Sequence, residues 1–268
     1  MNRSLARAGL GATTVLGARF TVAAVLLLGI LAIRRMPLTP APGERSRVFL
    51  LGAIGYMTES TLFFMGLERG SAAAVSLLFY TYPALVTLGE IIMGWERPRR
   101  TTFVALSLSA LGSILVVAAG SDVSISGAGV ALAMGSSATF TVYLLITSRV
   151  VVHTDALTTG AWMAVGAAVA FLSRGLVMGD LHSPAGHVPA LIGNGVATAS
   201  AFALMFASIR RLGPTRTSVV MTLEAFFAIA LAALFLGEGI RPLQAVGGLA
   251  ILAATALIAV RRPVAAEL

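Results

Sequence analysis

Residues 71–94 read SAAAVSLLFYTYPALVTLGEIIMG and contain one charged side chain, that of Glu90. About 20 apolar residues are enough for an α-helix to cross the hydrocarbon core of a bilayer. A helix on the surface of a soluble protein carries a charged face, and this run does not. It therefore predicts a membrane-spanning helix, with Glu90 near one end and reaching towards the membrane surface.

Similar runs lie on both sides of this stretch. The nine predicted spans are 14–33, 48–67, 71–94, 101–119, 128–148, 157–178, 189–209, 217–236 and 242–260. Of all residues, 57% are hydrophobic and 11% are charged, whereas about 25% are charged in an ordinary soluble domain. A soluble chain this poor in charge could not cover its own surface. We expect an all-α integral membrane protein folded as a nine-helix bundle.

Several chemistries are excluded by missing residue types. The chain has no cysteine, so it has no disulfide, thiolate nucleophile or cysteine-based metal site. Lysine is absent too, and with it the lysine of a phosphate-binding P-loop. No constellation typical of an intramembrane enzyme, such as HExxH, is present. We expect neither enzyme activity nor a cofactor or metal site.

Arginine is distributed unevenly between the two predicted membrane faces. Thirteen arginines lie on one face: Arg34, Arg35, Arg45, Arg47, Arg97, Arg99, Arg100, Arg149, Arg210, Arg211, Arg216, Arg261 and Arg262. Five lie on or near the other: Arg3, Arg7, Arg69, Arg174 and Arg241. Because arginine-rich loops stay in the cytoplasm, we expect the C-terminus inside and the N-terminus outside a bacterial-type plasma (inner) membrane. This distribution explains the net charge of +8 without a nucleic-acid partner.

The chain also repeats itself weakly at a constant offset of 143 positions (160 − 17 = 195 − 52 = 143). Matched pairs are Gly17 and Gly160, Gly52 and Gly195, Phe63 and Phe206, and Gly94 and Gly237. Equivalent helices are five spans apart, an odd number, so the two copies are inverted in the membrane, as in many secondary transporters. We expect one repeat of four helices in 1–120 and one of five in 121–268, the leading helix of the first copy being missing.

Three short segments keep their order and spacing along nearly the whole chain. They are residues 17–20 (GARF), residues 80–83 (YTYP) in a helix that ends Gly94-Trp95-Glu96, and residues 223–224 (LE) in a helix that ends Leu236-Gly237-Glu238. Together they resemble the EamA-type transporters of the drug/metabolite transporter (DMT) superfamily. The resemblance implies a ten-helix basket of two inverted-topology repeats, here lacking its first helix, that exports metabolites or amino acids.

Two glutamates, Glu59 and Glu224, lie near the middle of predicted spans. A charged carboxylate at that depth costs about 2.5–3.5 kcal/mol on insertion scales. It should therefore face a wet cavity or carry a proton, and either property suits a proton-coupled carrier or a counter-ion to a cationic substrate group. The alternative is a neutral, hydrogen-bonded glutamate with a structural role.

A proline and two tyrosines lie in the middle of the 71–94 span. Pro83 cannot donate a hydrogen bond to the carbonyl of Phe79, so we expect a helix kink that frees this acceptor. The hydroxyls of Tyr80 and Tyr82 would lie beside it and could help to bind a polar substrate group. The alternative is a packing kink with tyrosines wedged between helices.

Three further residues are candidates to line a substrate path. Tyr56 lies on the same predicted helix face as Glu59, and Asn194 and Thr198 lie one turn apart on another helix. Their alternative role is hydrogen bonding between helices.

The sequence therefore favours a secondary transporter that moves a small-molecule substrate across the lipid bilayer by alternating access, most simply as an exporter. Two other classes stay open: an inactive or non-transporting membrane remnant or scaffold, and, with less support, an intramembrane enzyme. A homodimer is compatible with the sequence, which carries no signal for or against it.

Overall fold

The computed structural model describes residues 12–95, 99–120, 124–181, 186–236 and 241–259. These residues form nine helical segments and no named strand, which confirms the predicted all-α membrane bundle. Some residues used above lie outside the described residues: Arg3, Arg7, Arg97, Arg261, Arg262, Glu96, Gly237 and Glu238.

Six segments are single helices: α2 (Ala12–Ile33), α7 (Arg100–Gly120), α8 (Gly127–Val150), α9 (Ala156–Met178), α10 (Val188–Leu212) and α13 (Pro242–Ala259). Three are divided: α3 (Arg45–Leu50), the π-helix η1 (Leu51–Tyr56) and α4 (Met57–Leu67); α5 (Ala72–Phe79) and α6 (Tyr82–Ile92); α11 (Pro214–Met221) and α12 (Leu223–Leu236). Among the described residues, seven segments are long and apolar enough to cross a membrane. The exceptions are the interrupted α11–α12 segment and the shorter α13.

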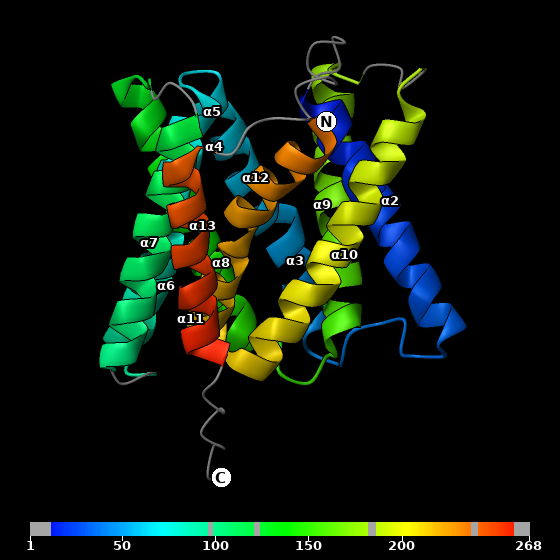
Figure 1. The fold of residues 1–268 in the computed structure, drawn as a ribbon. Helices are drawn as coiled ribbons and strands as arrows, with labels where there is room; N and C mark the ends of the chain where they lie inside the picture. Colours follow the sequence, from blue (N-terminus) through cyan, green and yellow to red (C-terminus); the bar gives the residue numbers. More distant parts are fainter. Residues whose placement is uncertain (1–11, 96–98, 121–123, 182–185, 237–240, 260–268) are drawn as a thin grey trace. The chain divides into compact units, whose positions relative to one another are not determined.

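Residues Met1–Thr58 and Ile146–Arg210 cluster into one compact unit, unit 1. Its described part is built on α2, which packs along α9, and on α3 and η1, which pack against the same helix. Figure 1 shows α2 and α9 side by side. The centre is aromatic, because the ring of Phe20 lies 5.1 Å from that of Tyr56 and 5.8 Å from that of Phe171.

Two glycines allow backbones to touch inside unit 1. A Cβ atom at Gly52 of η1 would lie 2.1 Å from the carbonyl oxygen of Met163 in α9. A Cβ atom at Gly166, about one turn further along α9, would lie 2.3 Å from the carbonyl oxygen of Phe49. Small residues permit such close approach of helices in membranes, where packing rather than the hydrophobic effect drives association.

Residues Glu59–Leu145 and Arg211–Leu268 form the second compact unit, unit 2. Here α7 lies against α13, as Figure 1 shows. The contact is again made through glycine, because a Cβ atom at Gly112 would lie 2.6 Å from the carbonyl oxygen of Gly247. In the same unit, α6 packs against α11.

The helices that pair are equivalents in the sequence repeat. Helices α2 and α9 begin at residues 12 and 156, and helices α7 and α13 begin at residues 100 and 242. Both separations equal the offset of the repeat to within one position. Each compact unit therefore combines helices from both sequence repeats. The repeats describe the order of the chain, and the units describe how the chain packs.

Unit 1 has a buried carboxylate at the start of α3. Glu44 is only 5% exposed. One oxygen accepts hydrogen bonds from the backbone N–H groups of Val152 and His153, and the other from the N–H and hydroxyl of Thr154. Burial by itself raises the pKa of Glu44, but the hydrogen bonds from Thr154, His153 and Val152 outweigh it and lower the pKa from 4.5 to about 2. The charged carboxylate therefore ties the α8–α9 loop to α3.

We expect Glu44→Gln to lower the stability of the purified protein at pH 7 by about 2 kcal/mol, since an amide replaces one charged acceptor oxygen by a donor. Because the folded-state pKa is depressed, the carboxylate contributes fully above about pH 4.5 and loses its contribution as the pH falls towards about 2. Thermal unfolding in detergent across this range should show the two proteins converging as the pH falls. Glu68→Gln is the control, because the Glu68 side chain is 74% exposed. A pH-independent difference would contradict the prediction.

Candidate functional site

Two helices of unit 2 are interrupted near their middle, at equivalent places. The first break lies between α5 and α6, at Tyr80 and Thr81. The N–H of Thr81 bonds to the carbonyl of Leu78, three residues back instead of four, and the Thr81 hydroxyl donates to the same carbonyl at 2.7 Å. Pro83 lies in the first turn of α6, where its missing N–H breaks no helical bond.

The second break lies at Thr222, between α11 and α12, and the offset of the repeat places it opposite Tyr80 to within one position. The N–H of Thr222 bonds to the carbonyl of Val219 and not to that of Ser218, four residues back. The Ser218 carbonyl instead accepts a hydrogen bond from the hydroxyl of Tyr82 at 3.2 Å. The break after α11 thus leaves the Ser218 carbonyl without its usual N–H donor, and Tyr82, the first residue of α6, supplies a hydroxyl donor in its place.

Glu224 lies in the first turn of α12, directly after the break. Its side chain is exposed, and it interacts electrostatically with the hydroxyls of Tyr80 and Tyr82. The interrupted segment runs from Pro214 to Leu236, which places Glu224 near its centre, about 15–18 Å from each end. The structure therefore brings three of the sequence-predicted residues together.

The two tyrosines differ in burial. Tyr82 is 2% exposed and its hydroxyl is used in the bond to Ser218, whereas Tyr80 is half-buried against the cluster of Val116, Ala225 and Ile251. We expect Tyr82→Phe to lower stability by about 1 kcal/mol, because it leaves the Ser218 carbonyl without that donor, and to leave the transport KM unchanged. Tyr80→Phe should change the transport KM with little loss of stability. Thermal unfolding and substrate-dependent transport rates check both, and the reverse pattern would contradict the assignment.

Glu59 lies in α4 and is 7% exposed. Its two carboxylate oxygens accept hydrogen bonds from the hydroxyls of Ser60, at 2.9 Å, and Ser136 of α8, at 3.2 Å. The Ser136 hydroxyl also reaches the backbone carbonyl of Glu59 at 3.2 Å. Glu59 therefore joins α4 to α8 within unit 2, which is the hydrogen-bonded structural arrangement that the sequence left open as an alternative.

The remaining candidates lie in unit 1. Tyr56 ends η1 and packs edge-on against Phe20 and Phe202, with ring centroids 5.1 Å apart in both pairs. Asn194 and Thr198 are buried in α10, and the Thr198 hydroxyl donates to the Asn194 carbonyl one turn before it. Tyr56 and Glu59, which the sequence predicts on one helix face, belong to different compact units.

Glu90 differs from its predicted role at the membrane surface. It is 7% exposed, and its carboxylate accepts a hydrogen bond from the backbone N–H of Thr215 at 3.1 Å, in the first turn of α11. The prediction was wrong because the start of α11 packs against α6. An anion at a helix N-terminus is favoured by the exposed N–H groups and the helix dipole. The signal that could have revealed this was Gly213-Pro214, which marks a new helix start.

The structure also contains a cavity of about 240 Å³ in unit 1, lined by residues of α8, α9 and α10 and the α8–α9 loop. None of the sequence-predicted residues lines it. Within the described part of the chain, no group of three or more His, Asp or Glu side chains is placed to hold a metal ion.

Comparison with known proteins gives a family match and a likeness in fold. Residues 3–118 and 127–260 each match the sequence model described as "EamA-like transporter family". A solved structure named only as "Crystal structure of protein" superposes with a TM-score of 0.81 at 16% identity, over 95% of this chain and 90% of the other. At that identity the likeness concerns the fold alone. No curated protein matches the chain.

Proposed function

Because the chain belongs to the EamA-like transporter family and is a multi-pass membrane transporter of the DMT type, we propose that it exports small metabolites or amino acids across the inner membrane. The family model matches twice, once in each half of the chain, and this supports two repeats close to 1–120 and 121–268. Export proceeds by alternating access, in which the protein exchanges between inward-open and outward-open states. Inverted repeats suit this mechanism, because exchanging their conformations exchanges the two openings.

The observation that carries the proposal is the pair of interrupted helices in unit 2. Secondary transporters use half-helices because their broken ends expose carbonyl and N–H groups to a substrate at the middle of the membrane. Here the breaks at Tyr80–Thr81 and Thr222 occupy equivalent places in the two repeats. Glu224 follows directly and supplies a carboxylate at mid-membrane depth.

In this mechanism Glu224 binds a proton or a cationic substrate group, and Tyr80 orients the substrate beside it. Tyr82 and Pro83 fix the two broken helices relative to each other through the Tyr82–Ser218 bond and the start of α6. Glu59, Tyr56, Asn194 and Thr198 remain proposed members of the path, Glu59 through the carboxylate that Ser60 and Ser136 orient.

The proposed orientation has the C-terminus in the cytoplasm and the N-terminus of the chain outside. Thirteen arginines on one face against five on the other support it. Cysteine accessibility can test it directly, because the chain has no cysteine of its own and single cysteines can be introduced in the loops.

The test of function is metabolite release. Cells that express the native chain at a measured membrane level are compared with empty-vector cells, and the medium is profiled for amino acids, amines and other small metabolites. We expect one chemical class to accumulate outside the expressing cells, and the purified protein to move the same compound in proteoliposomes. Equal profiles, together with no movement of candidate compounds in proteoliposomes, would contradict the proposal and favour a non-transporting membrane protein.

A further inference from the structure

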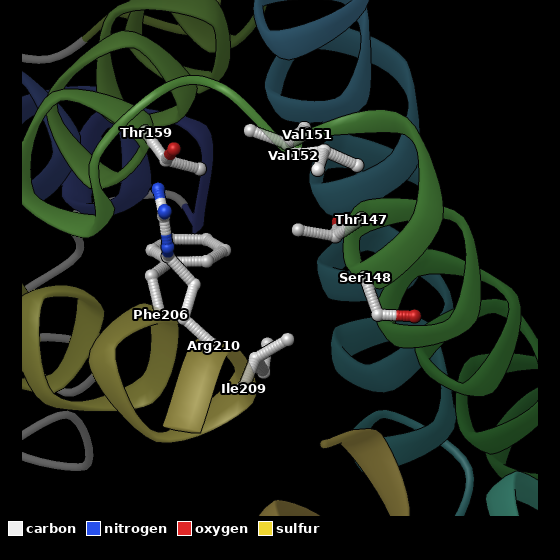
Figure 2. Close-up of a pocket in the computed structure, with 8 residues that line it drawn as sticks. All are labelled: Thr147, Ser148, Val151, Val152, Thr159, Phe206, Ile209 and Arg210. Atoms are coloured by element: carbon white, nitrogen blue, oxygen red, sulfur yellow. The ribbon is translucent and has the colours of Figure 1, made fainter. Parts of the chain in front are cut away.

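The cavity in unit 1 is placed where three helices end or begin. Its walls are the last turns of α8 and α10 and the start of α9, with the loop between α8 and α9 (Figure 2). The lining residues are Thr147, Ser148, Val151, Val152, Thr159, Phe206, Ile209 and Arg210. Its volume of about 240 Å³ is below the roughly 300–1,000 Å³ of pockets that hold drug-sized ligands, so the cavity suits a small headgroup.

The cation of this cavity is Arg210. One of its guanidinium N–H groups donates to the backbone carbonyl of Thr154, and Figure 2 shows the guanidinium pointing towards Thr159. Thr154 is itself fixed, because its N–H and hydroxyl donate hydrogen bonds to Glu44. A guanidinium has five N–H donors in a planar fork, so this bond orients Arg210 and leaves donors for a bound anion.

A second polar group of the cavity lacks a partner. The hydroxyl of Thr147 is buried in a side chain that is 3% exposed, and it makes no hydrogen bond to any described residue. Other threonines within these helices bond back to a carbonyl one turn earlier, as Thr141 does to Ser137 at 2.9 Å. A buried hydroxyl without a partner is costly. Because this hydroxyl has almost no accessible surface of its own, it would meet a bound acceptor oxygen by turning to the second χ1 rotamer that threonine adopts in helices.

The location favours phosphate as that acceptor. The cavity lies at the ends of α8 and α10 that carry Arg149 and Arg210, which belong to the arginine-rich face of the chain. Basic pockets between transmembrane helices at such a face bind anionic phosphate headgroups, and arginine matches phosphate with two parallel hydrogen bonds. The apolar walls from Val151, Phe206 and Ile209 suit the carbon part of an organic phosphate.

We propose that this cavity binds an anionic phosphate group, with Arg210 and Thr147 donating hydrogen bonds to its oxygens. The group belongs either to an anionic phospholipid or to a small soluble phosphate. The site shares no residue with the proposed transport path, and its existence does not depend on the proposed function.

The experiment uses the full chain purified in a phosphate-free maltoside detergent. Its thermal stability is followed while short-chain phosphatidylglycerol, short-chain phosphatidylcholine or inorganic phosphate is titrated in, because a ligand that binds the folded state raises the unfolding temperature. We expect stabilisation by phosphatidylglycerol beyond that by phosphatidylcholine. Stabilisation by inorganic phosphate as well identifies a site that accepts the free ion, and its absence identifies a headgroup site.

Matched variants separate a built site from general charge attraction. Arg210→Gln should weaken binding of the stabilising phosphate about tenfold or more, the effect of losing a charged hydrogen-bond donor. Arg211→Gln removes the same charge one position along the chain, outside the cavity lining, and should leave binding unchanged. If Arg210→Gln fails to fold, Thr147→Val decides. This variant should be at least as stable as the native chain without ligand, because it removes an unsatisfied hydroxyl, and should still bind phosphate more weakly.

Two results would overturn the proposal. One is the absence of any stabilisation by phosphatidylglycerol and by inorganic phosphate. The other is an equal loss of affinity in Arg210→Gln and Arg211→Gln with full affinity in Thr147→Val, which would show a surface charge effect with no part for the cavity.

Discussion

Glu224→Gln is expected to reduce the transport rate about ten- to hundredfold, the effect of losing a charged hydrogen-bonding group worth about 1.5–3 kcal/mol. Glutamine keeps the size and hydrogen-bonding reach of the side chain but can neither bind a proton nor pair with a cation. The side chain is exposed directly after the break at Thr222, so the substitution should leave the fold intact. Initial rates in proteoliposomes, with the metabolite found in the export experiment, measure the effect.

Two controls make this prediction specific. The variant must unfold at the same temperature as the native chain, which excludes loss of activity through loss of fold. Glu68→Gln removes a carboxylate whose side chain is 74% exposed near the end of α4 and pairs only loosely with Arg69, at 3.9 Å, and it should transport normally. Native rates in Glu224→Gln would remove this residue from the path and would favour a carrier that relies on the backbone of the broken helices alone.

Gly52→Ala should have the largest effect on folding. The new Cβ atom would lie 2.1 Å from the carbonyl oxygen of Met163 and 2.8 Å from its carbonyl carbon. These are backbone atoms of α9, so no side-chain rotation relieves the clash, and η1 must move away from α9. We expect a loss of about 3 kcal/mol or more, seen as a lower unfolding temperature and less protein in the membrane.

The matched control is Gly29→Ala in α2, where a Cβ atom would meet nothing within 4 Å. That change should be neutral or slightly stabilising, because alanine favours the helix more than glycine does. If Gly52→Ala and Gly29→Ala accumulate and unfold alike, the contact between η1 and α9 is not needed for the fold.

Much of the candidate site could be found from the sequence because depth in the membrane is a property of sequence position. Glu224 and Tyr80 were identified because polar side chains inside long apolar runs are costly, and the structure places them in one unit with Tyr82. The partners could not be found in this way. The bonds from Tyr82 to Ser218 and from Thr215 to Glu90 join groups that lie far apart in the chain, by 136 and 125 positions.

The cavity beside Arg210 shows the same limit. The topology rule explains why arginine lies at that helix end. The rule places every arginine of this face on the cytoplasmic side and does not distinguish one from another. Only the folded chain distinguishes Arg210, which lines a cavity and bonds to the Thr154 carbonyl, from Arg211, which does not line it.

The sequence by itself determined that this chain is a helical membrane protein with nine segments in two repeats, because a bilayer requires each span to be a long apolar run that satisfies its own backbone. Only the tertiary structure decided how those segments pair. Equivalent helices of the two repeats, α2 with α9 and α7 with α13, pack against each other within separate units. Such pairing depends on glycines such as Gly52 and Gly112 meeting backbone across a contact. In lipid, helices associate through close packing and not through burial of apolar surface. Which helices fit together therefore depends on their three-dimensional shape, which cannot be predicted from any single run of residues.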